Sequence, residues 1–487
     1  MSQSSSFLAT RRGKATLALL SAIAFLDFID ASIVNIALPD IRKDLNFSVQ
    51  DLQWVLSGYL LTYGGFMLLG GRAGDLLGRR RVLVTGTTLF AVSSLVGGLA
   101  GNAGVLVGAR LAQGLGAALM LPAALSLLTT SFKEGSDRTK ALGVWGGVAG
   151  LASAAGVFLG GVLTEGPGWR WVLFVNPPIA VFLLGAIFWL IPGEARRAPL
   201  ANFDIVGTVL VTGGMLLLVY TLVKAPDQGW GSGRTIGELI GAAVLLAAFV
   251  ANEQRTRNPL IPLSIFRVKG LAAADVTQLI GVGGFVTMFF FLTLYMQNVL
   301  GYSPVETGSA YLPLTVGVGI SAGISSQLIG RIGTRPVIVA GAMITAGGLY
   351  YLSRIPVDGS YLTDLFPGLM IVSFGIGGVF VATTTAANAG VPADKAGLAA
   401  ALVNSAQQVG GALGLAIFTA IATSRTNDLL AGRHPMPEAL TSGFHRALFA
   451  AGIFLLAAAV IALRTNNTRG DVAQQSIDEP RPEPARV

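Results

Sequence analysis

The sequence contains no cysteine and only two histidines, His434 and His445, among its 487 residues. The absence of cysteine excludes disulfides, thiolate metal sites and cysteine nucleophiles. Both histidines fall in or beside one polar segment, so no buried histidine relay is available for proton transfer. Charged residues make up 12% of the chain, whereas soluble domains contain about 25%. This scarcity of charge excludes an ordinary soluble fold.

The sequence also lacks a P-loop, which requires Gly-x4-Gly-Lys-Ser/Thr. The only Gly-Lys pair, Gly13-Lys14, has Leu8 where the first glycine is required and Ala15 where Ser or Thr is required. A metal-binding cluster and a nucleophile–histidine pair are missing from the sequence as well. We therefore expect no enzymatic activity, no cofactor and no ATPase subunit.

Long apolar segments fill most of the chain. Hydrophobic residues account for 53% of it, and the mean hydropathy is +0.67. About 20 apolar residues suffice to cross the hydrocarbon core of a bilayer. By this measure 14 spans are predicted, at 15–38, 51–71, 82–102, 105–130, 141–164, 171–192, 203–224, 236–252, 270–299, 306–328, 336–353, 361–388, 396–422 and 441–463. The chain is predicted to be an all-α, multi-pass integral membrane protein.

The distribution of basic residues sets the predicted orientation. With the N-terminus inside, most loop cations fall on the inner side, from Arg11 and Arg12 to Lys395 and Arg464, as the positive-inside rule requires. Both termini are therefore expected in the cytoplasm, and the protein is expected to be a monomer in the cell (plasma or inner) membrane. The net charge of +8 is spread over short loops. A lipid bilayer is thus the expected surrounding, and no nucleic-acid partner is expected.

The two halves of the chain repeat each other. Three glycines recur at the same spacing 254 residues later, Gly143, Gly156 and Gly160 as Gly397, Gly410 and Gly414. Duplicated helical halves are a design of membrane transporters. The expected parts are a cytoplasmic N-terminus, a six-helix bundle, two inserted helices, a second six-helix bundle and a disordered cytoplasmic tail, at 1–14, 15–197, 198–257, 258–464 and 465–487.

Two carboxylates interrupt the first span. Asp27 and Asp30 are three residues apart in an otherwise apolar segment, so they project from nearly the same helix face. A charged side chain at this depth costs roughly 2.5–3.5 kcal/mol on insertion scales and is rarely present without a function. Such a pair is typical of a membrane protein that holds a proton, a cation or both.

The loop after the second span carries a patterned run of glycine, acid and arginine, Gly71-Arg72-Ala73-Gly74-Asp75-Leu76-Leu77-Gly78-Arg79-Arg80-Arg81. It resembles the cytoplasmic loop signature of the major facilitator superfamily. Glycines such as Gly71 and Gly78 permit a tight turn. The resemblance implies a gate in which Asp75 latches the two halves, with Arg79 and Arg80 as further gating residues. Alternatively, Asp75 caps a helix and the arginines are only topology signals.

Further motifs resemble those of the fourteen-helix drug:proton antiporters within that superfamily. They are the segment from Asp30 to Pro39, the run from Arg110 to Gly116, the segment from Trp169 to Pro177, and Gly156 and Gly160 beside Val157, where the family usually has proline. The resemblance implies a major facilitator fold of two pseudo-symmetric six-helix bundles plus two inserted helices. It also implies proton-coupled export and a gating role for the two glycines.

Helix geometry pairs the first and fourth spans. Asp30 and Arg110 are each expected roughly 10 Å below the outer surface, at 1.5 Å per residue. A buried arginine needs a partner, and Asp30 or Asp27 is the obvious one. Because protonation would break this pair, Asp30 is expected to be the main proton carrier and Asp27 to shape cation preference. The alternative is a static ion pair. Asp275, near the start of the ninth span, is either a second proton-coupling site or a helix N-terminal charge.

Substrate-binding side chains are expected beside the acids and in the ninth span. The candidates are Asp27, Phe28, Asn35, Tyr59, Tyr63, Gln113, Phe289 and Tyr295. The leading interpretation is a secondary transporter that uses the proton as coupling ion and exports apolar, often cationic drugs or toxic compounds by alternating access. A dedicated exporter of one endogenous metabolite, antibiotic or lipid is the alternative. A membrane enzyme or channel is the third interpretation, but an enzyme should show a catalytic constellation and a channel would not need duplicated halves.

Overall fold

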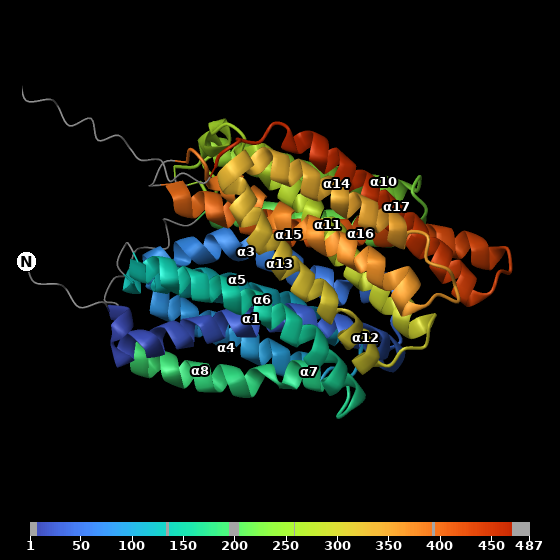
Figure 1. Cartoon of the computed structure of the whole chain (residues 1–487), viewed down its shortest axis with the longest axis horizontal. Helices are drawn as coiled ribbons and strands as arrows, with labels where there is room; N and C mark the ends of the chain where they lie inside the picture. The colour runs from blue at the N-terminus through green and yellow to red at the C-terminus, as the bar shows by residue number, and fades with distance from the viewer. Residues whose placement is uncertain (1–6, 133–135, 194–203, 258, 392–394, 470–487) are drawn as a thin grey trace, which may run out of the picture.

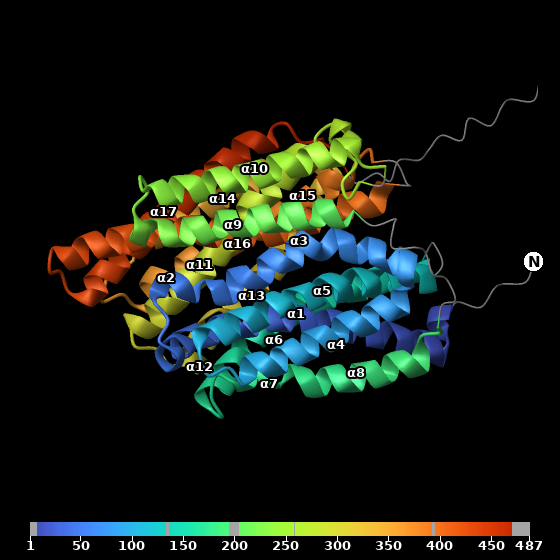
Figure 2. The same cartoon turned by 180° about the vertical axis from the view of Figure 1, so that it is seen from behind.

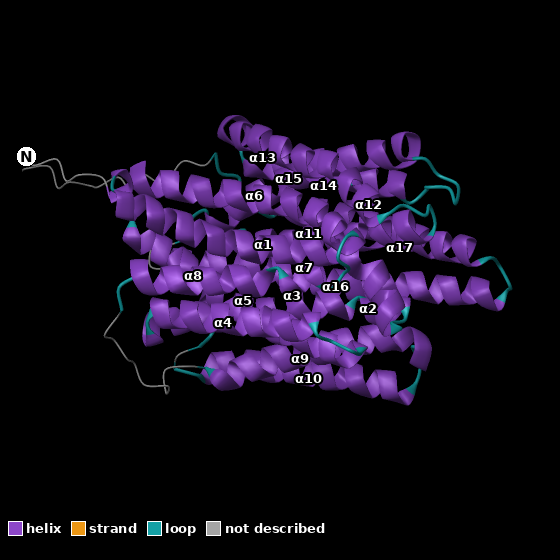
Figure 3. Ribbon diagram, turned by 90° about the horizontal axis from the view of Figure 1, so that it is seen from below, coloured by secondary structure: helices purple, strands orange, loops and turns teal. Residues whose placement is uncertain are grey.

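The structure is a computed structural model that describes residues 7–132, 136–193, 204–257, 259–391 and 395–469. The regular elements in these ranges are all helices, which lie side by side along the long axis of the molecule (Figure 1). Figure 3 shows no strand in the described part. The predicted all-α fold is confirmed. Most of the predicted cytoplasmic tail lies outside the described residues.

The helices follow one another without any intervening domain in the described ranges. Those of the first half are η1 (Phe7–Ala9), α1 (Arg11–Leu45), α2 (Val49–Leu52), α3 (Trp54–Leu77), α4 (Arg79–Gly98), α5 (Ala103–Ser131), α6 (Ser136–Glu165), α7 (Trp171–Phe174) and α8 (Asn176–Leu190). Then come α9 (Ile205–Gln228) and α10 (Gly233–Arg255). The second half contains η3 (Leu263–Arg267), α11 (Leu271–Asn298), α12 (Pro304–Ala310), α13 (Leu312–Ile332), α14 (Thr334–Leu352), η4 (Tyr361–Leu365), α15 (Phe366–Asn388), α16 (Ala396–Ala431) and α17 (Met436–Ala462).

Thirteen helical segments in the described part are long and apolar enough to cross a membrane. They correspond to every predicted span except the fifth, 141–164. That span falls in α6, in which Leu151–Glu165 is the apolar stretch found. Some helices extend beyond the predicted spans, since α1 continues through Pro39 to Leu45. Hydropathy locates the apolar part of a helix, whereas its backbone hydrogen bonds continue into polar ends.

The helices form two groups with α9 and α10 on one flank. Helices α1 to α8 lie together, and α11 to α17 lie mostly on the other side (Figures 1 and 2). Helix α9 packs on α3 and α16, where these two helices meet, and α10 packs on α9. Lys224 of α9 forms an ion pair with Asp51 of α2 at 2.6 Å. The inserted helices therefore contact both halves of the molecule.

Repeated glycines occupy equivalent helix crossings in the two halves. Gly160 of α6 lies against α1, where an added Cβ would be 2.7 Å from the carbonyl oxygen of Ile33. Its counterpart Gly414 of α16 lies against α11, where an added Cβ would be 2.7 Å from the carbonyl oxygen of Gly283. Real Cβ atoms are not found this close to backbone, so only glycine permits both crossings. The repeat seen in the sequence is thus a repeat of helix packing.

The turn between α3 and α4 also recurs between α13 and α14. Gly78 ends α3 with φ 100°, and Gly333 ends α13 with φ 88°. These backbone conformations are rare for residues with a side chain. The duplicated glycines therefore set the same sharp turn in each half, and Arg79 and Thr334 begin the helices that follow.

Large apolar side chains are exposed on the outer faces of many helices. Examples are Val92 of α4, Phe182 and Trp189 of α8, Val209 of α9, Val244 of α10 and Val316 of α13, exposed by 53% to 80%. A soluble protein rarely exposes so much contiguous apolar surface. In a bilayer these faces meet lipid, while the helices satisfy their own backbone groups. The chain is a multi-pass membrane protein.

Candidate functional site

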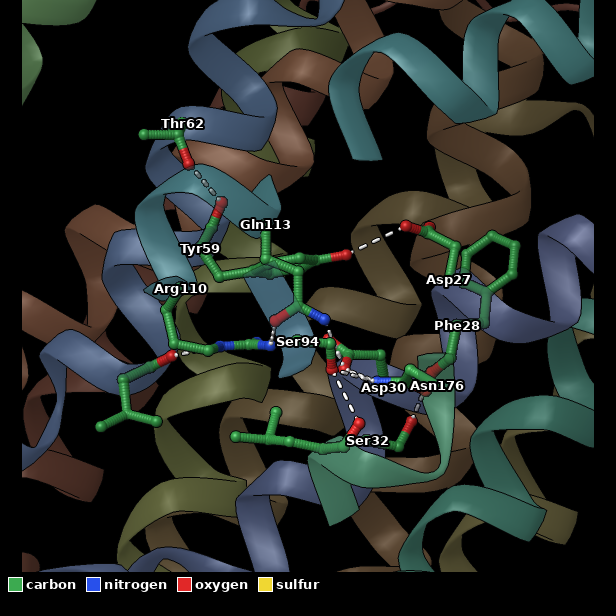
Figure 4. Close-up of polar contacts among 12 residues, drawn as sticks. Asp27, Phe28, Asp30, Ser32, Tyr59, Thr62, Ser94, Arg110, Gln113 and Asn176 are labelled. Carbon is green, nitrogen blue, oxygen red and sulfur yellow. Dashed lines mark hydrogen bonds and ion pairs between the residues drawn. The ribbon is translucent and has the colours of Figure 1, made fainter. Parts of the chain in front are cut away.

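A buried ion pair joins α1 to α5 (Figure 4). Arg110 Nη1 donates to Asp30 Oδ2 at 2.7 Å, and the exposed fractions of the two side chains are 1% and 0%. Gln113 Nε2 donates to Asp30 Oδ1 at 2.8 Å. Asn176 Nδ2 of α8 donates to the same oxygen at 2.6 Å. Donors from two helices other than α1 therefore stabilise the negative charge of Asp30.

The guanidinium of Arg110 is also held by neutral groups. Its Nε donates to the carbonyl oxygen of Val55 at 3.0 Å, and its Nη1 donates to Gln113 Oε1 at 2.7 Å. Its Cζ lies 4.3 Å from the ring centroid of Tyr59, a distance suited to a cation–π interaction. A buried charge needs such partners because it has lost its water. Arg110 is thus fixed between α1, α3 and α5.

Asp27 lies one turn before Asp30 but has different partners. Tyr59 Oη donates to Asp27 Oδ1 at 2.9 Å, and Tyr63 Oη donates to Oδ2 at 2.8 Å. Asp27 is 2% exposed, and no cation of the described residues forms an ion pair with it. Burying an unpaired carboxylate is costly, whereas burying a protonated carboxyl is much less so. The two acids therefore differ in their chemistry although they share a helix face.

Helix periodicity and one close crossing explain the position of the tyrosines. Tyr59 and Tyr63 are four residues apart on α3, so their rings share a face, and their centroids lie 5.6 Å apart. A side chain at Gly114 of α5 would collide with the carbonyl of Tyr59. Glycine at this position lets α3 and α5 approach where Gln113 reaches the acids.

Asn176 lies in the motif from Trp169 to Pro177 but was not among the predicted site residues. It begins α8 immediately before Pro177, and proline suits the first turn of a helix because its missing N–H is not needed there. The Asn176 amide bridges Asp30 to Ser94 Oγ of α4, at 2.6 and 3.0 Å. Its signals in the sequence are its place in that motif and an amide at the start of an apolar helix.

The structure brings most of the first-half predictions into one cluster. Its members, which we call the acid cluster, are Asp27, Asp30, Tyr59, Tyr63, Arg110 and Gln113. Phe28 is half-buried next to it on α1 (Figure 4). Asn35 lies further along α1 and donates to Thr293 Oγ1 of α11 at 3.2 Å. Asn35 therefore belongs to the seam between the halves rather than to the acid cluster.

The second-half predictions do not bond to the acid cluster. Phe289 stacks on Tyr311 with ring centroids 4.5 Å apart. Tyr295 donates to the backbone carbonyl of Pro356, in the loop before η4. Asp275 is 9% exposed, and neither of its carboxylate oxygens has a hydrogen-bond partner among the described residues. The second half therefore offers an aromatic surface and one isolated acid.

Several predicted gating residues lie at the turn from α3 to α4. Gly78 sets this turn, and Arg79 is the first residue of α4. Arg80 Nη2 donates to the carbonyl oxygen of Phe188 in α8 at 3.3 Å. The side chain of Asp75 lies outside the part that the structure describes, so its latch role stays a prediction.

The other predicted gating residues are glycines inside helices. A Cβ at Gly71 of α3 would lie 3.9 Å from Cβ of Pro122 in α5, an ordinary contact. A Cβ at Gly156 of α6 would lie 2.6 Å from Cβ of Ser32 in α1, and Gly160 follows one turn later on the same crossing. Gly156 and Gly160 thus set how closely α6 approaches the helix that carries the acids.

The chain matches the family model described as the Major Facilitator Superfamily over residues 20–415. It is 39% identical over 471 residues to the puromycin resistance protein pur8 of Streptomyces alboniger, covering 94% of this chain and 92% of that protein. It is 40% identical to the tetracenomycin C resistance and export protein of Streptomyces glaucescens, covering 82% and 74%. It is 36% identical to the cephamycin export protein CmcT of Amycolatopsis lactamdurans, covering 93% of this chain and 93% of that protein.

A solved structure shows the same fold at low sequence identity. The inward-facing, unoccupied crystal structure of a bacterial homologue of the human lysosomal transporter Spinster matches with a TM-score of 0.67. The identity is 16%, and the match covers 93% of this chain and 97% of that one. The family match and these relatives cover most of the chain. The chain belongs to the major facilitator superfamily, within its drug:proton antiporter family.

Proposed function

We propose that the protein is a proton-coupled exporter of apolar, often cationic drugs or antibiotics, which works by alternating access. The names of its relatives, which specify resistance to puromycin and export of tetracenomycin C or cephamycin, support this class of substrate. The observation that carries the proposal is the unequal partnering of two buried acids, Asp27 with two phenols and Asp30 with an arginine.

Asp27 is the proton-exchanging group in this proposal. Among the described residues, its side-chain hydrogen bonds come from the hydroxyls of Tyr59 and Tyr63, which are neutral. Asp30 has Arg110 and two amide donors, which hold its charge in place. The acid without a cation is the one whose protonation state changes most readily when its surroundings change. This assignment reverses the roles that the sequence alone favours for the two acids.

Transport requires the two halves to move apart at the seam between them, which opens the way to the acid cluster. Tyr59 and Tyr63 are 1% and 2% exposed, so substrate and water reach them only after a movement. Gln297 Nε2 of α11 donates to the carbonyl oxygen of Ile36 in α1 at 3.0 Å, next to the bond from Asn35. Breaking such seam bonds opens one side of the site, and re-forming them closes it.

The orientation follows from charge. Arg11, Arg12 and Lys14 at the start of α1 lie on the same predicted side as the arginines that begin α4. We place this side in the cytoplasm of a cell membrane, with both chain termini inside. We further propose that the protein acts as a monomer, and as a transporter rather than an enzyme. The second point is supported by the acid cluster, which lies among apolar helices and contains an ion pair instead of an activated nucleophile.

The decisive experiment uses purified protein in liposomes with an imposed pH gradient. Asp27→Asn should abolish gradient-driven transport of a cationic and of a neutral compound, while downhill exchange and the unfolding temperature persist. Asp44→Asn is the matched control, because Asp44 lies on the same helix but pairs with Arg170 near the outer end. Gradient-driven transport by Asp27→Asn at the normal rate would contradict the assignment of the proton.

A dedicated exporter of one endogenous product is the second candidate. It is favoured by three relatives whose names each specify a single antibiotic. The same liposomes separate the two functions when they are tested with chemically diverse dyes and drugs. Transport of several unrelated compounds supports the multidrug function, and transport of one compound class alone supports the dedicated exporter.

A further inference from the structure

Two pockets open side by side at the end of the first half where α4 begins and α8 ends. One has a volume of about 440 Å³ and is lined by Arg80, Arg81, Val84, Thr85, Phe188 and Gly193. The other, of about 390 Å³, contains Arg12 and shares Gly193. Neither belongs to the acid cluster. By the predicted topology, both open at the cytoplasmic edge of the bilayer.

Positive charge is concentrated at this edge. The first turn of α4 begins with Arg79, Arg80 and Arg81 and contains no acidic residue. The N-terminus of a helix attracts anions, and Arg80 and Arg81 add positive charge there, which favours a negatively charged ligand. Arg80 donates a hydrogen bond to the backbone carbonyl of Phe188, and Arg12 donates one to that of Leu190, both at 3.3 Å. Because a guanidinium has five N–H donors, each retains donors for a phosphate.

An exposed stripe continues from this charge along the helices. Arg81, Thr85, Thr88, Val92 and Val96 of α4 are all exposed and are spaced by three or four residues, so they share one helix face. On the neighbouring α8, Phe188 is 59% and Trp189 is 80% exposed. Figure 2 shows α4 and α8 side by side at the margin of the molecule. A cationic end followed by an apolar face matches the head and tails of a phospholipid.

We propose that the 440 Å³ pocket binds the headgroup of an anionic phospholipid. The phosphate oxygens bridge Arg80 and Arg81, while the acyl chains follow the stripe on α4 and α8. Basic pockets between helices on the cytoplasmic side suit such headgroups. The arginines select an anionic over a zwitterionic lipid, and the apolar stripe selects a lipid over a free phosphate.

Binding to purified protein in a zwitterionic detergent tests the site directly. The probe is an acyl-labelled fluorescent phosphatidylglycerol, compared with the same label on phosphatidylcholine and with glycerol phosphate as a soluble competitor. We expect saturable binding of phosphatidylglycerol, at least tenfold weaker binding of phosphatidylcholine, and no competition by millimolar glycerol phosphate. Equal binding of both lipids would overturn the headgroup site. Full competition by glycerol phosphate would overturn the lipid and leave only a phosphate site.

Variants localise the binding. Each arginine removed should weaken binding roughly fivefold, so Arg80→Gln with Arg81→Gln should weaken it about 25-fold. Arg81→Gln is also tested alone, because Arg80 donates a hydrogen bond to α8 and its removal could destabilise the fold. The matched control is Arg255→Gln with Arg331→Gln, two exposed arginines on the same predicted side. Wild-type affinity in the Arg81→Gln protein, or an equal loss in the control, would refute the site.

Discussion

The two halves of the molecule share their helix crossings but not their chemistry. When residue numbers are shifted by about 250, α1 corresponds to α11. Gly160 contacts Ile33 of α1 in the first half, and Gly414 contacts Gly283 of α11 in the second. A similar shift carries α5 onto α15, since Gly116 faces Gly86 as Gly375 faces Gly341. Under these shifts, Asp27, Asp30, Arg110 and Gln113 correspond to Thr277, Ile280, Leu369 and Val372. The charged network of the first half thus has no charged counterpart in the second.

This difference assigns separate tasks to the halves. Buried charges need fixed partners, and in the first half Arg110 is held by three hydrogen bonds. In the second half, Phe285, Phe289 and Phe380 pack against one another with centroids 5.0 and 5.7 Å apart. Aromatic contacts tolerate many shapes, because they depend on area more than on direction. We infer that duplication conserved the scaffold while the first half acquired the coupling chemistry.

The largest expected effect is on the ion pair that only the first half contains. Arg110→Ala should destabilise the fold by about 3–5 kcal/mol, because it leaves Asp30 buried without its cation. Asp30→Asn should also destabilise, and the double variant should lose less than the sum of the two losses. Unfolding of the three variants in detergent measures this coupling. Strict additivity would show that the pair contributes no interaction of its own.

Glycine crossings should behave alike in both halves. Gly160→Ala and Gly414→Ala each place a Cβ 2.7 Å from a carbonyl oxygen, and such overpacking costs about 1–3 kcal/mol. Gly319→Ala is the control, since no atom lies within 4 Å of its added Cβ. Unfolding temperatures report the effect. A large loss in one half and none in the other would show that the halves are not packed equivalently.

Removing one tyrosine hydroxyl should reduce gradient-driven transport when the tyrosine lies in the first half but hardly at all when it lies in the second. Tyr63→Phe keeps the ring but deletes the bond to Asp27, and a bond to a carboxylate is worth about 1.5–3 kcal/mol, or roughly tenfold in rate or more. Tyr311→Phe deletes comparable bonds, to Thr293 and Phe289, yet should change gradient-driven transport less than about twofold if only the first half couples protons. Similar losses in both variants would place coupling in both halves.

The sequence was sufficient for the fold and for the main contacts of the acid cluster, but not for the partners that come from distant turns. Helical depth alone predicts that Asp30 meets Arg110, because both positions are counted from span ends. Tyr59 and Tyr63 were chosen because they neighbour the carboxylates or resemble side chains that line a binding site. Asn176 was missed because its approach depends on the break between α7 and α8 at Val175. Tyr295 was expected in the site, but its ring turns toward Pro356, which helix periodicity does not specify.

The smallest expected effect concerns Asp275, the isolated acid of the second half. Asp275 is the fifth residue of α11, so it lies just beyond the first turn, and the helix dipole acts mainly within that turn. Its oxygens have no hydrogen-bond partner among the described residues. Both facts favour a carboxyl that gains and loses a proton over a fixed helix charge. Asp275→Asn should therefore leave substrate binding and the unfolding temperature nearly unchanged and lower the number of protons exchanged per substrate. The slope of the substrate gradient at equilibrium against the imposed pH gradient measures that number. An unchanged slope would show that proton coupling resides in the first half alone and that Asp275 is only a helix charge.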